Sequence, residues 1–404
     1  MKETTAVPAG YQGREQAWIK HLLLENYLEK LLLIVGMGGR RSGEIELCYV
    51  DCFAGPWGDD TTDIESTSIA ISLRTMENCR RVLKGKGVNV KMRALYIERD
   101  DAAFQRLREH LLQPRQDSIT AECMHGDFVE LREAILSWCG RQAFTFFFVD
   151  PKGWKSVGVP TLKPLLARPR SEFLINFMYD FINRTASMQS WRQEISEFLG
   201  CSEESLESLH EKKPAMREES LVMTYRENLK SACEVDRNGA PPRTAHVRVM
   251  DPGRQRARYH LVYLTSHPKG IVKFMEISEK LDAVQRKVSA SKKSSKREMK
   301  SGTADLFGAE SFESSVPGPN VVDPVEIDGF WLQYLTEGTK RVGEAEMANL
   351  LESTGWMPSD FQASLLRLIA AGDLKNLDAV KPRRTRPLHY EKNGERLALT
   401  QIQI

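Results

Sequence analysis

The sequence lacks the cysteine pairs of a metal site and the long apolar run of a membrane protein. Its seven cysteines are widely spaced, and because none forms a C-x-x-C pair, neither a zinc site nor a disulfide framework is indicated. The longest apolar run covers residues 31–35, far short of a membrane-spanning helix. The first sixteen residues contain no apolar signal-peptide segment. These absences predict a cytoplasmic protein with reduced cysteines and without a metal site.

The sequence also lacks an excess of charge of either sign. Its 404 residues include 57 Lys and Arg against 55 Asp and Glu, a formal net charge of +2. Bulk charge alone therefore gives no argument for a nucleic-acid partner. Hydrophobic residues make up 41% and charged residues 28% of the chain, which is typical of a globular protein. The length allows two or three domains.

Short apolar segments alternate with helical segments over much of the chain. This alternation predicts βαβ units and a parallel sheet with right-handed crossovers. The continuous apolar run 144–149 fits a strand covered on both faces. Residues 186–235 read as a helical insertion, and residues 243–265 as an antiparallel hairpin around a D-P-G turn. The predicted fold class is α/β with a Rossmann-like sheet, and its closing hairpin is more usual in class I methyltransferases than in dinucleotide dehydrogenases.

Changes of composition divide the chain into four parts. Residues 1–43 form an N-terminal helical segment, whose helix is expected to end at the glycines that follow residue 35. Residues 44–285 form the Rossmann-like domain. Residues 286–325 read as a linker, with seven Lys or Arg and one Glu between positions 286 and 300. Residues 326–404 show three helical segments and a basic turn between two strands, the pattern of a winged-helix domain.

The strongest local signal is the segment D-C-F-A-G-P, residues 51–56. An acidic residue at a strand end, followed by an Ala-Gly turn, lets the backbone approach a bound nucleoside closely. The absence of G-x-G-x-x-G disfavours a dinucleotide. The form D-x-F-A-G resembles the cofactor turn of nucleic-acid methyltransferases, although a purely structural turn is the alternative. The predicted cofactor is S-adenosylmethionine, contacted by Asp51, Phe53, Ala54, Gly55 and Pro56.

Two further strand ends carry carboxylates that suit a nucleoside. Glu98 ends the second strand, where a carboxylate can accept both ribose hydroxyls. Asp127 follows the third strand and can accept the adenine amino group, while Phe128 can cover the ring. The alternative for Asp127 is an ordinary helix N-cap. We expect Glu98, Asp127 and Phe128 to contact the cofactor.

The segment D-P-K-G-W, residues 150–154, follows the fourth strand. In amino-methyltransferases a D/N-P-P-Y/F element accepts the protons of the target amine and stacks an aromatic ring on the base. Lys152 replaces the second proline of that element, and the aromatic arrives late as Trp154. Asp150, Pro151, Lys152 and Trp154 are the predicted catalytic residues, with a capped strand end as the alternative.

Other candidates are polar residues near the fifth strand and cations of the C-terminal part. Asn176, Tyr179 and Arg184 are predicted to lie near the substrate, although Arg184 has Asp180 as an alternative partner. The basic run 292–300 and the basic turn are candidates for phosphate contact. The cations of that turn are Lys381, Arg383, Arg384 and Arg386.

In their order, these motifs resemble the three-Cys-motif partner proteins (TcmP). The segments are Y-V-D-C-F-A-G-P-W, A-L-Y-I-E-R-D, H-G-D-F, F-F-F-V-D-P-K-G-W, E-F-L-I-N-F and the hairpin with the start of the next helix. The resemblance covers residues 15–285 and implies a Rossmann-type methyltransferase encoded beside a radical-SAM-like partner protein. The sequence departs from the family at Trp57, where a glycine is usual, and at Lys152, where an aromatic is usual. Winged-helix tails occur on some members, in mobile or anti-phage gene neighbourhoods.

Three functions follow from these residues. The first is a methyltransferase that uses S-adenosylmethionine on a nucleic acid or a nucleotide-type substrate. The second is a binding module that senses a nucleoside or a partner protein, with a winged helix docked on DNA, and Trp57 and Lys152 favour it. A nuclease is a weaker third, because the carboxylates lack the close spacing of a two-metal site.

Overall fold

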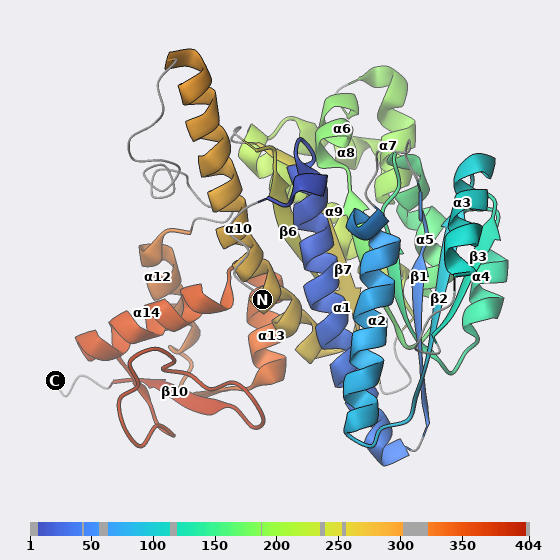
Figure 1. Cartoon of the computed structure of the whole chain (residues 1–404). Helices are drawn as coiled ribbons and strands as arrows, with labels where there is room; N and C mark the ends of the chain where they lie inside the picture. The colour runs from blue at the N-terminus through green and yellow to red at the C-terminus, as the bar shows by residue number, and fades with distance from the viewer. Residues whose placement is uncertain are drawn as a thin grey trace.

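The centre of the computed structural model is a seven-stranded sheet (Figure 1). The structure describes residues 7–42, 44–55, 64–113, 119–186, 188–234, 239–252, 256–301 and 322–400. The strands of this sheet are β1 (Ile45–Asp51), β2 (Val90–Glu98), β3 (Thr120–His125), β4 (Phe144–Val149), β5 (Ser171–Phe177), β6 (Arg243–Met250) and β7 (Ala257–Thr265).

The strand order is β3-β2-β1-β4-β5-β7-β6. Strands β1 to β5 pair in parallel, so their C-terminal ends meet at one edge of the sheet. Strand β7 is antiparallel to both β5 and β6. The prediction of a mixed α/β fold with a mostly parallel sheet and an antiparallel hairpin is confirmed, and the arrangement is consistent with a Rossmann-like fold.

Helices cover both faces of the sheet, because successive strand residues point to opposite sides. In β1, Leu47 and Tyr49 belong to the apolar cluster on one face, whereas Val50 belongs to the cluster on the other. The first face is covered by α1 (Glu15–Ser42), α2 (Ser68–Gly85), α3 (Asp101–Leu111) and α10 (Pro268–Ser301). The second is covered by α4 (Arg132–Cys139), α5 (Val159–Leu166), α6 (Tyr179–Thr185), α7 (Arg192–Leu199), α8 (Glu203–His210) and α9 (Pro214–Ala232).

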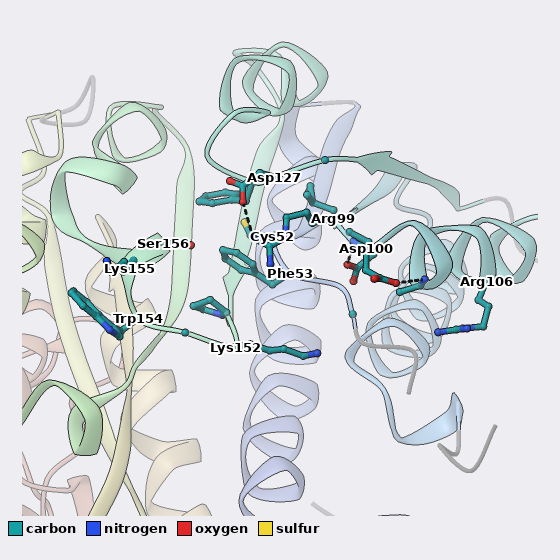
Figure 2. Close-up of a pocket in the computed structure, with 18 of the residues that line it drawn as sticks. Cys52, Phe53, Arg99, Asp100, Arg106, Asp127, Lys152, Trp154, Lys155 and Ser156 are labelled. Carbon is teal, nitrogen blue, oxygen red and sulfur yellow. Dashed lines mark hydrogen bonds and ion pairs between the residues drawn. The ribbon is translucent and has the colours of Figure 1, made fainter. Parts of the chain in front are cut away.

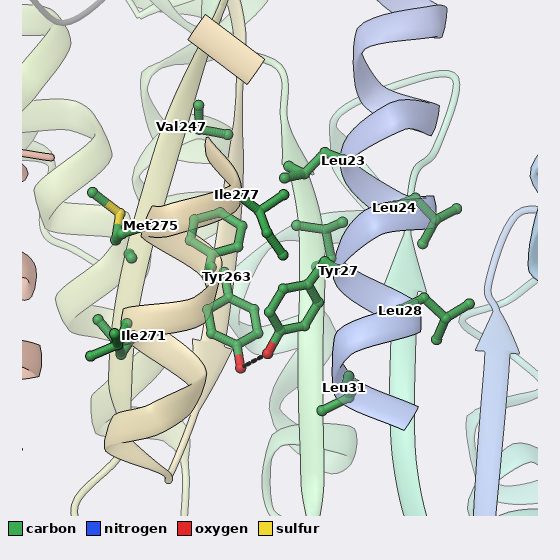
Figure 3. Packing of buried hydrophobic residues seen from close by; sticks show 14 of the residues in the cluster. Leu23, Leu24, Tyr27, Leu28, Leu31, Val247, Tyr263, Ile271, Met275 and Ile277 are labelled. Atoms are coloured by element: carbon green, nitrogen blue, oxygen red, sulfur yellow. Dashed lines mark hydrogen bonds between the residues drawn. The ribbon is translucent and has the colours of Figure 1, made fainter. Parts of the chain in front are cut away.

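Helices α1 and α10 pack side by side over β7 (Figure 3). Tyr27 of α1 meets Tyr263 of β7, with ring centroids 4.8 Å apart, and their hydroxyls hydrogen-bond. The Tyr27 hydroxyl also donates to Oε2 of the buried Glu172, at 2.9 Å. This contact ties the first helix of the chain to the closing hairpin. No helix among the described residues is long and apolar enough to cross a membrane.

The expectation that α1 ends near residue 35 is wrong, because the helix continues to Ser42. Glycines are costly in a helix, by about 1 kcal/mol each relative to alanine. Two of them allow close packing here: a Cβ at Gly36 would lie 2.5 Å from Cδ1 of Leu83, and a Cβ at Gly39 would lie 2.7 Å from Cγ2 of Ile45. Tertiary packing therefore overrides the local helix-breaking signal.

The expectation of a linker that starts at residue 286 is also wrong. Residues 286–301 form the C-terminal half of α10, a helix of 34 residues. Val288, Ala290 and Ser294 are buried, and Val288 clusters with Tyr11 and Trp18. Burial of these side chains stabilises a helix that the basic composition alone did not predict. The rest of the expected linker, up to residue 321, lies outside the described residues.

The C-terminal part combines helices with a small antiparallel sheet of order β8-β10-β9. Its apolar core, with Trp331 and Phe361, continues into the cluster formed by α1, α10 and the large sheet. The three helices and the two strands on either side of the basic turn agree with expectation, whereas the strand at residues 340–342 was not predicted. The winged-helix assignment itself stays a prediction. The elements are α12 (Pro324–Tyr334), β8 (Lys340–Val342), α13 (Glu344–Thr354), α14 (Pro358–Ala371), β9 (Leu374–Asn376) and β10 (Glu395–Leu399).

Candidate functional site

A cavity of about 780 Å³ opens at the C-terminal edge of the parallel strands (Figure 2). Ligands of open α/β sheets bind outside this edge. Its wall is built from the segments that follow β1, β2, β3 and β4, together with α3 and α6. Of the sequence-predicted residues, the cavity brings together Phe53, Gly55, Glu98, Asp127, Phe128, Pro151, Lys152 and Trp154.

The turn after β1 is packed directly against Glu98. The Ala54 backbone N–H donates to the Ile97 carbonyl at 2.8 Å, which joins the turn to the end of β2. A Cβ at Gly55 would lie 2.6 Å from Cδ of Glu98 and would overlap Oε2. Only glycine fits at this position without displacing the carboxylate. Ala54 is buried and does not line the cavity, and Pro56 lies outside the described residues.

The Glu98 side chain is oriented by the chain that follows it. Its Oε1 accepts a hydrogen bond from the Asp100 backbone N–H at 2.7 Å. The Asp100 side chain caps α3 by accepting from the Ala103 N–H at 2.9 Å. These two bonds fix the loop between β2 and α3, so Oε2 of Glu98 is held beside Gly55 in the cavity wall.

Asp51 lies behind the turn and not in the cavity wall. Its side chain is fully buried, and it accepts hydrogen bonds from the Ser68 hydroxyl at 2.7 Å and from the Phe53 N–H at 3.2 Å. Burial raises the pKa of the Asp51 carboxyl to about 7, against the effect of these two donors. The structure therefore gives Asp51 the position of a residue that shapes the turn.

Asp127 and Phe128 form the wall on the β3 side. Asp127 Oδ1 accepts from the Val129 N–H at 2.8 Å, and Oδ2 lies 3.5 Å from Arg99 Nη1. Asp127 is not the N-cap of α4, a place taken by Leu131. The Phe128 ring is buried against Phe53, with centroids 5.0 Å apart.

Asp150 ends the central strand β4, and both of its carboxylate oxygens have partners. Oδ2 accepts from the Lys20 ammonium of α1, and Oδ1 accepts from Asn176 Nδ2 at 2.7 Å. Lys20 and Asp150 are both mostly buried, at 14% and 16% side-chain exposure. Asp150 does not line the cavity. Lys20 was not predicted from the sequence, because it lies 130 positions from Asp150 on a helix that carries no motif.

Trp154 lines the cavity but is held inside an aromatic cluster. It stacks on Phe181, with centroids 5.6 Å apart, and meets Phe198 edge-on at 5.3 Å. Only 6% of the residue is exposed. The expected stacking of Trp154 on a base is therefore not supported by its surroundings, because little of either ring face is accessible.

The cavity wall also carries four cations, of which the sequence argument named one. Lys152 is exposed, and within the described part of the chain it has no ion-pair partner. Lys155 lies 5.1 Å from the Trp191 ring centroid. Arg99 lies between β2 and α3, and Arg106 lies in the middle of α3. Such cations would attract anionic groups of a ligand. In the sequence, these four cations are marked only by their position a few residues after a strand that ends in a carboxylate.

The remaining predicted residues lie away from the cavity. Tyr179 is buried against His260, with centroids 5.6 Å apart. Arg184 lies 3.5 Å from Asp180, which is the alternative that the sequence left open. Asn176 holds Asp150. Among the residues that the structure describes, no group of three or more His, Cys, Asp or Glu side chains is arranged to hold a metal ion.

The basic turn of the C-terminal part lies between β9 and β10. Two of its four cations form ion pairs with carboxylates of the C-terminal part. Arg383 donates to both oxygens of Glu395, at 2.7 and 2.6 Å, and Arg386 donates to Glu391 at 2.6 Å. Lys381 and Arg384 are exposed. Two of the four predicted phosphate contacts are thus already neutralised by carboxylates of the same module.

Comparison with known proteins gives little further information. No family model and no curated protein matches the sequence, so the resemblance to three-Cys-motif partner proteins stays a prediction. Protein LPL1258 from Legionella pneumophila, of family DUF519, has a TM-score of 0.37 at 10% identity, over 66% of this chain and 92% of its own. A loganic acid methyltransferase with SAH has a TM-score of 0.28 at 9% identity, over 67% and 86%. Neither likeness is strong enough to assign an activity.

Proposed function

We propose that the cavity binds S-adenosylmethionine and that the protein is a methyltransferase for a nucleic acid or a nucleotide-type acceptor. The observation that carries the proposal is the contact between Gly55 and Glu98. It brings a bare backbone turn and a strand-end carboxylate to one cavity wall, and a bound nucleoside needs both. Asp127 and Phe128 line the same cavity.

Each wall residue has a role that suits its surroundings. Glu98 would accept the ribose hydroxyls, Asp127 would accept the adenine amino group, and Phe128 would limit the pocket beside the ring. When bound, S-adenosylmethionine supplies a methyl group on a positively charged sulfur, and its transfer to the acceptor leaves S-adenosylhomocysteine. Pro151 and Lys152 lie in the same cavity and would flank the acceptor.

Asp150 would act on the acceptor through the chain that follows it. Lys20 and Asn176 each contact one oxygen of its carboxylate. These contacts hold Asp150 at the end of β4, so that it would position the segment from Pro151 to Trp154. Methyl transfer depends on alignment more than on acid–base power, and a rigidly held segment serves alignment.

Calorimetric titration with S-adenosylhomocysteine tests the proposal. We expect micromolar binding by the native protein and loss of at least tenfold in affinity on Glu98→Gln. We also expect loss of binding on Gly55→Ala, because its Cβ would overlap the Glu98 carboxylate. Gly85→Ala is the matched control, since a Cβ there meets no atom within 4 Å. A folded native protein that binds neither S-adenosylmethionine nor S-adenosylhomocysteine would contradict the proposal.

A second candidate is a binding module without methyl transfer. It is favoured by the engaged Asp150 and by the enclosed Trp154, which leave neither residue free to orient a target base. The two candidates separate when the protein is incubated with labelled S-adenosylmethionine and mixed DNA or RNA. Binding of the nucleoside without any transfer of label supports the module.

The partner implied by the sequence resemblance is part of the same proposal. We propose that a radical-SAM-like protein with three cysteines cooperates with this chain, and that the C-terminal part is a winged helix. Co-purification of the two proteins from cells that express both tests the partnership, and it fails if the pair does not co-elute.

A further inference from the structure

The basic half of α10, residues 286–300, has an unexpected position in the fold. Helix α10 starts at Pro268, just after β7 ends at the opposite edge of the sheet from the cavity. It then runs back along the sheet. Gln285 Oε1 accepts from the Met250 N–H, and Gln285 Nε2 donates to the Arg248 carbonyl, both at 3.0 Å. Because β6 runs in the same direction as β1 to β5, Met250 lies at the C-terminal edge.

Beyond Gln285 the helix therefore passes the edge at which the cavity opens. Figure 1 shows this end of α10 projecting from the body of the molecule. Residues 286–300, which we call the basic arm, extend about 22 Å at 1.5 Å per residue. That length matches about six or seven phosphates along one nucleic-acid strand, at 3.4 Å each.

The arm packs against the rest of the molecule, so its cations are held in fixed positions. Its apolar side is buried against the start of the chain, where Val288 contacts the cluster of Tyr11 and Trp18. Lys292 Nζ lies 3.3 Å from Glu15 at the start of α1. A rigid arm loses less conformational entropy on binding a polyanion than a flexible basic tail would.

Four of the seven cations of the arm form no ion pair within the described part of the chain. The arm contains seven Lys or Arg and one Glu, a net charge of +6, so the rest of the chain has a net charge of −4. Arg286, Lys287, Lys293 and Lys296 have no ion-pair partner within the described residues. The arm is thus a local cationic surface on a molecule that is otherwise slightly acidic.

We infer that the basic arm binds the phosphodiester backbone of the acceptor nucleic acid at the cavity edge of the sheet. The inference deepens the proposed function by assigning the acceptor surface to the arm and not to the basic turn of the C-terminal part. Two arginines of that turn are held by Glu395 and Glu391. An anionic membrane fits less well, because membrane-surface helices need an exposed apolar face, whereas Val288 and Ala290 of the arm are buried.

The test compares two triple variants of the full-length protein. In the arm variant, Lys287→Gln, Lys293→Gln and Lys296→Gln remove three unpaired charges, and glutamine has nearly the helix propensity of lysine. In the matched control, Lys375→Gln, Lys381→Gln and Arg384→Gln remove three exposed charges from the C-terminal part. Fluorescence anisotropy measures the affinity for labelled 20-nucleotide single- and double-stranded DNA and RNA between 50 and 200 mM salt, and circular dichroism checks the helix content.

We expect the arm variant to bind its preferred nucleic acid at least tenfold more weakly at 100 mM salt, and its salt slope to fall by about 3. The control variant should change affinity less than twofold. The inference is overturned if the control variant loses binding and the arm variant keeps it. It is equally overturned if the native protein binds phosphatidylserine vesicles but no nucleic acid, or binds neither.

The result is independent of the cofactor. Calorimetric titration of the arm variant with S-adenosylhomocysteine should give the native affinity, because the arm contributes no residue to the cavity wall. Failure of the native protein to bind S-adenosylhomocysteine would contradict the proposed function and leave the arm's nucleic-acid affinity as measured.

Discussion

At the scale of single residues, burial decides what a carboxylate can do. Asp51 and Glu98 both end central strands of the sheet, and both fit the same motif argument. Asp51 is fully buried behind the turn, whereas Glu98 reaches the cavity. A strand-end carboxylate thus predicts the edge of the sheet on which a site lies, but its exposure decides whether it touches a ligand or shapes the loop.

The raised pKa of Asp51 predicts a pH-dependent contribution to stability. The folded protein favours the protonated carboxyl up to about pH 7, whereas an unfolded chain releases the proton near pH 4. The stability that Asp51 contributes is therefore full below about pH 4 and is lost as the pH rises to about 7. The loss is at most about 1.4 kcal/mol per pH unit in this window.

Asp51→Asn removes this titration. We expect the variant to become more stable relative to the native protein as the pH rises from 4 to 7. Above pH 7 the difference between their unfolding free energies should stay constant. Urea unfolding at pH 5, 6, 7 and 8 measures it. Asp373→Asn, at an exposed position, is the control for the loss of one carboxyl group. A difference for Asp51→Asn that does not change with pH would show that the Asp51 carboxyl is ionised in the folded protein throughout this range.

At the scale of elements, α1 shows how packing overrides a local signal. Its glycine-rich end was expected to stop the helix, yet Gly36 and Gly39 are the contact points with Leu83 and Ile45. Small residues at such points let two elements approach closely, and the buried contact offsets the conformational entropy that glycine loses. The same helix brings Lys20 to Asp150, so its length and packing also affect the site.

Two substitutions in α1 separate the packing role of glycine from its cost. Gly38 faces solvent, and a Cβ there meets no atom within 4 Å, so Gly38→Ala should stabilise the protein by about 1 kcal/mol. Gly36→Val should destabilise it by roughly 1–3 kcal/mol through overpacking against Leu83. Chemical denaturation of both variants measures the two free energies. Equal effects of the same sign would argue against the packing explanation.

At the scale of the whole molecule, the C-terminal part shares an apolar core with the Rossmann-like part. Polar contacts of Glu352 also join the two parts. Glu352 of α13 accepts from the Thr244 N–H at 2.9 Å and from Lys230 at 3.2 Å, and its Oε2 lies 3.4 Å from Arg243. The buried Arg226 donates to the Glu352 carbonyl at 3.1 Å. The two parts should therefore unfold together.

Glu352→Ala should weaken this coupling. The mostly buried Arg243 would lose its carboxylate, and Lys230 would keep only Glu227, 2.8 Å from its ammonium. We expect a cost of about 2–4 kcal/mol. We expect thermal unfolding to change from one transition to two, with earlier release of the C-terminal part detected by limited proteolysis. Glu326→Gln, at an exposed position of α12, is the control. A single transition at the native midpoint would show that the apolar contacts alone join the two parts.

The sequence by itself determined the succession of strands and helices along the chain. It also determined the edge of the sheet at which the cavity lies. Both follow from local periodicity and from residues at strand ends, which act over a few positions. Only the tertiary structure decided which candidates line the cavity. Asp51 is buried, Asp150 is held by Lys20, and the expected linker forms a helix against Tyr11 and Trp18. These outcomes depend on contacts between residues 130 or more positions apart, or on burial that local periodicity does not record.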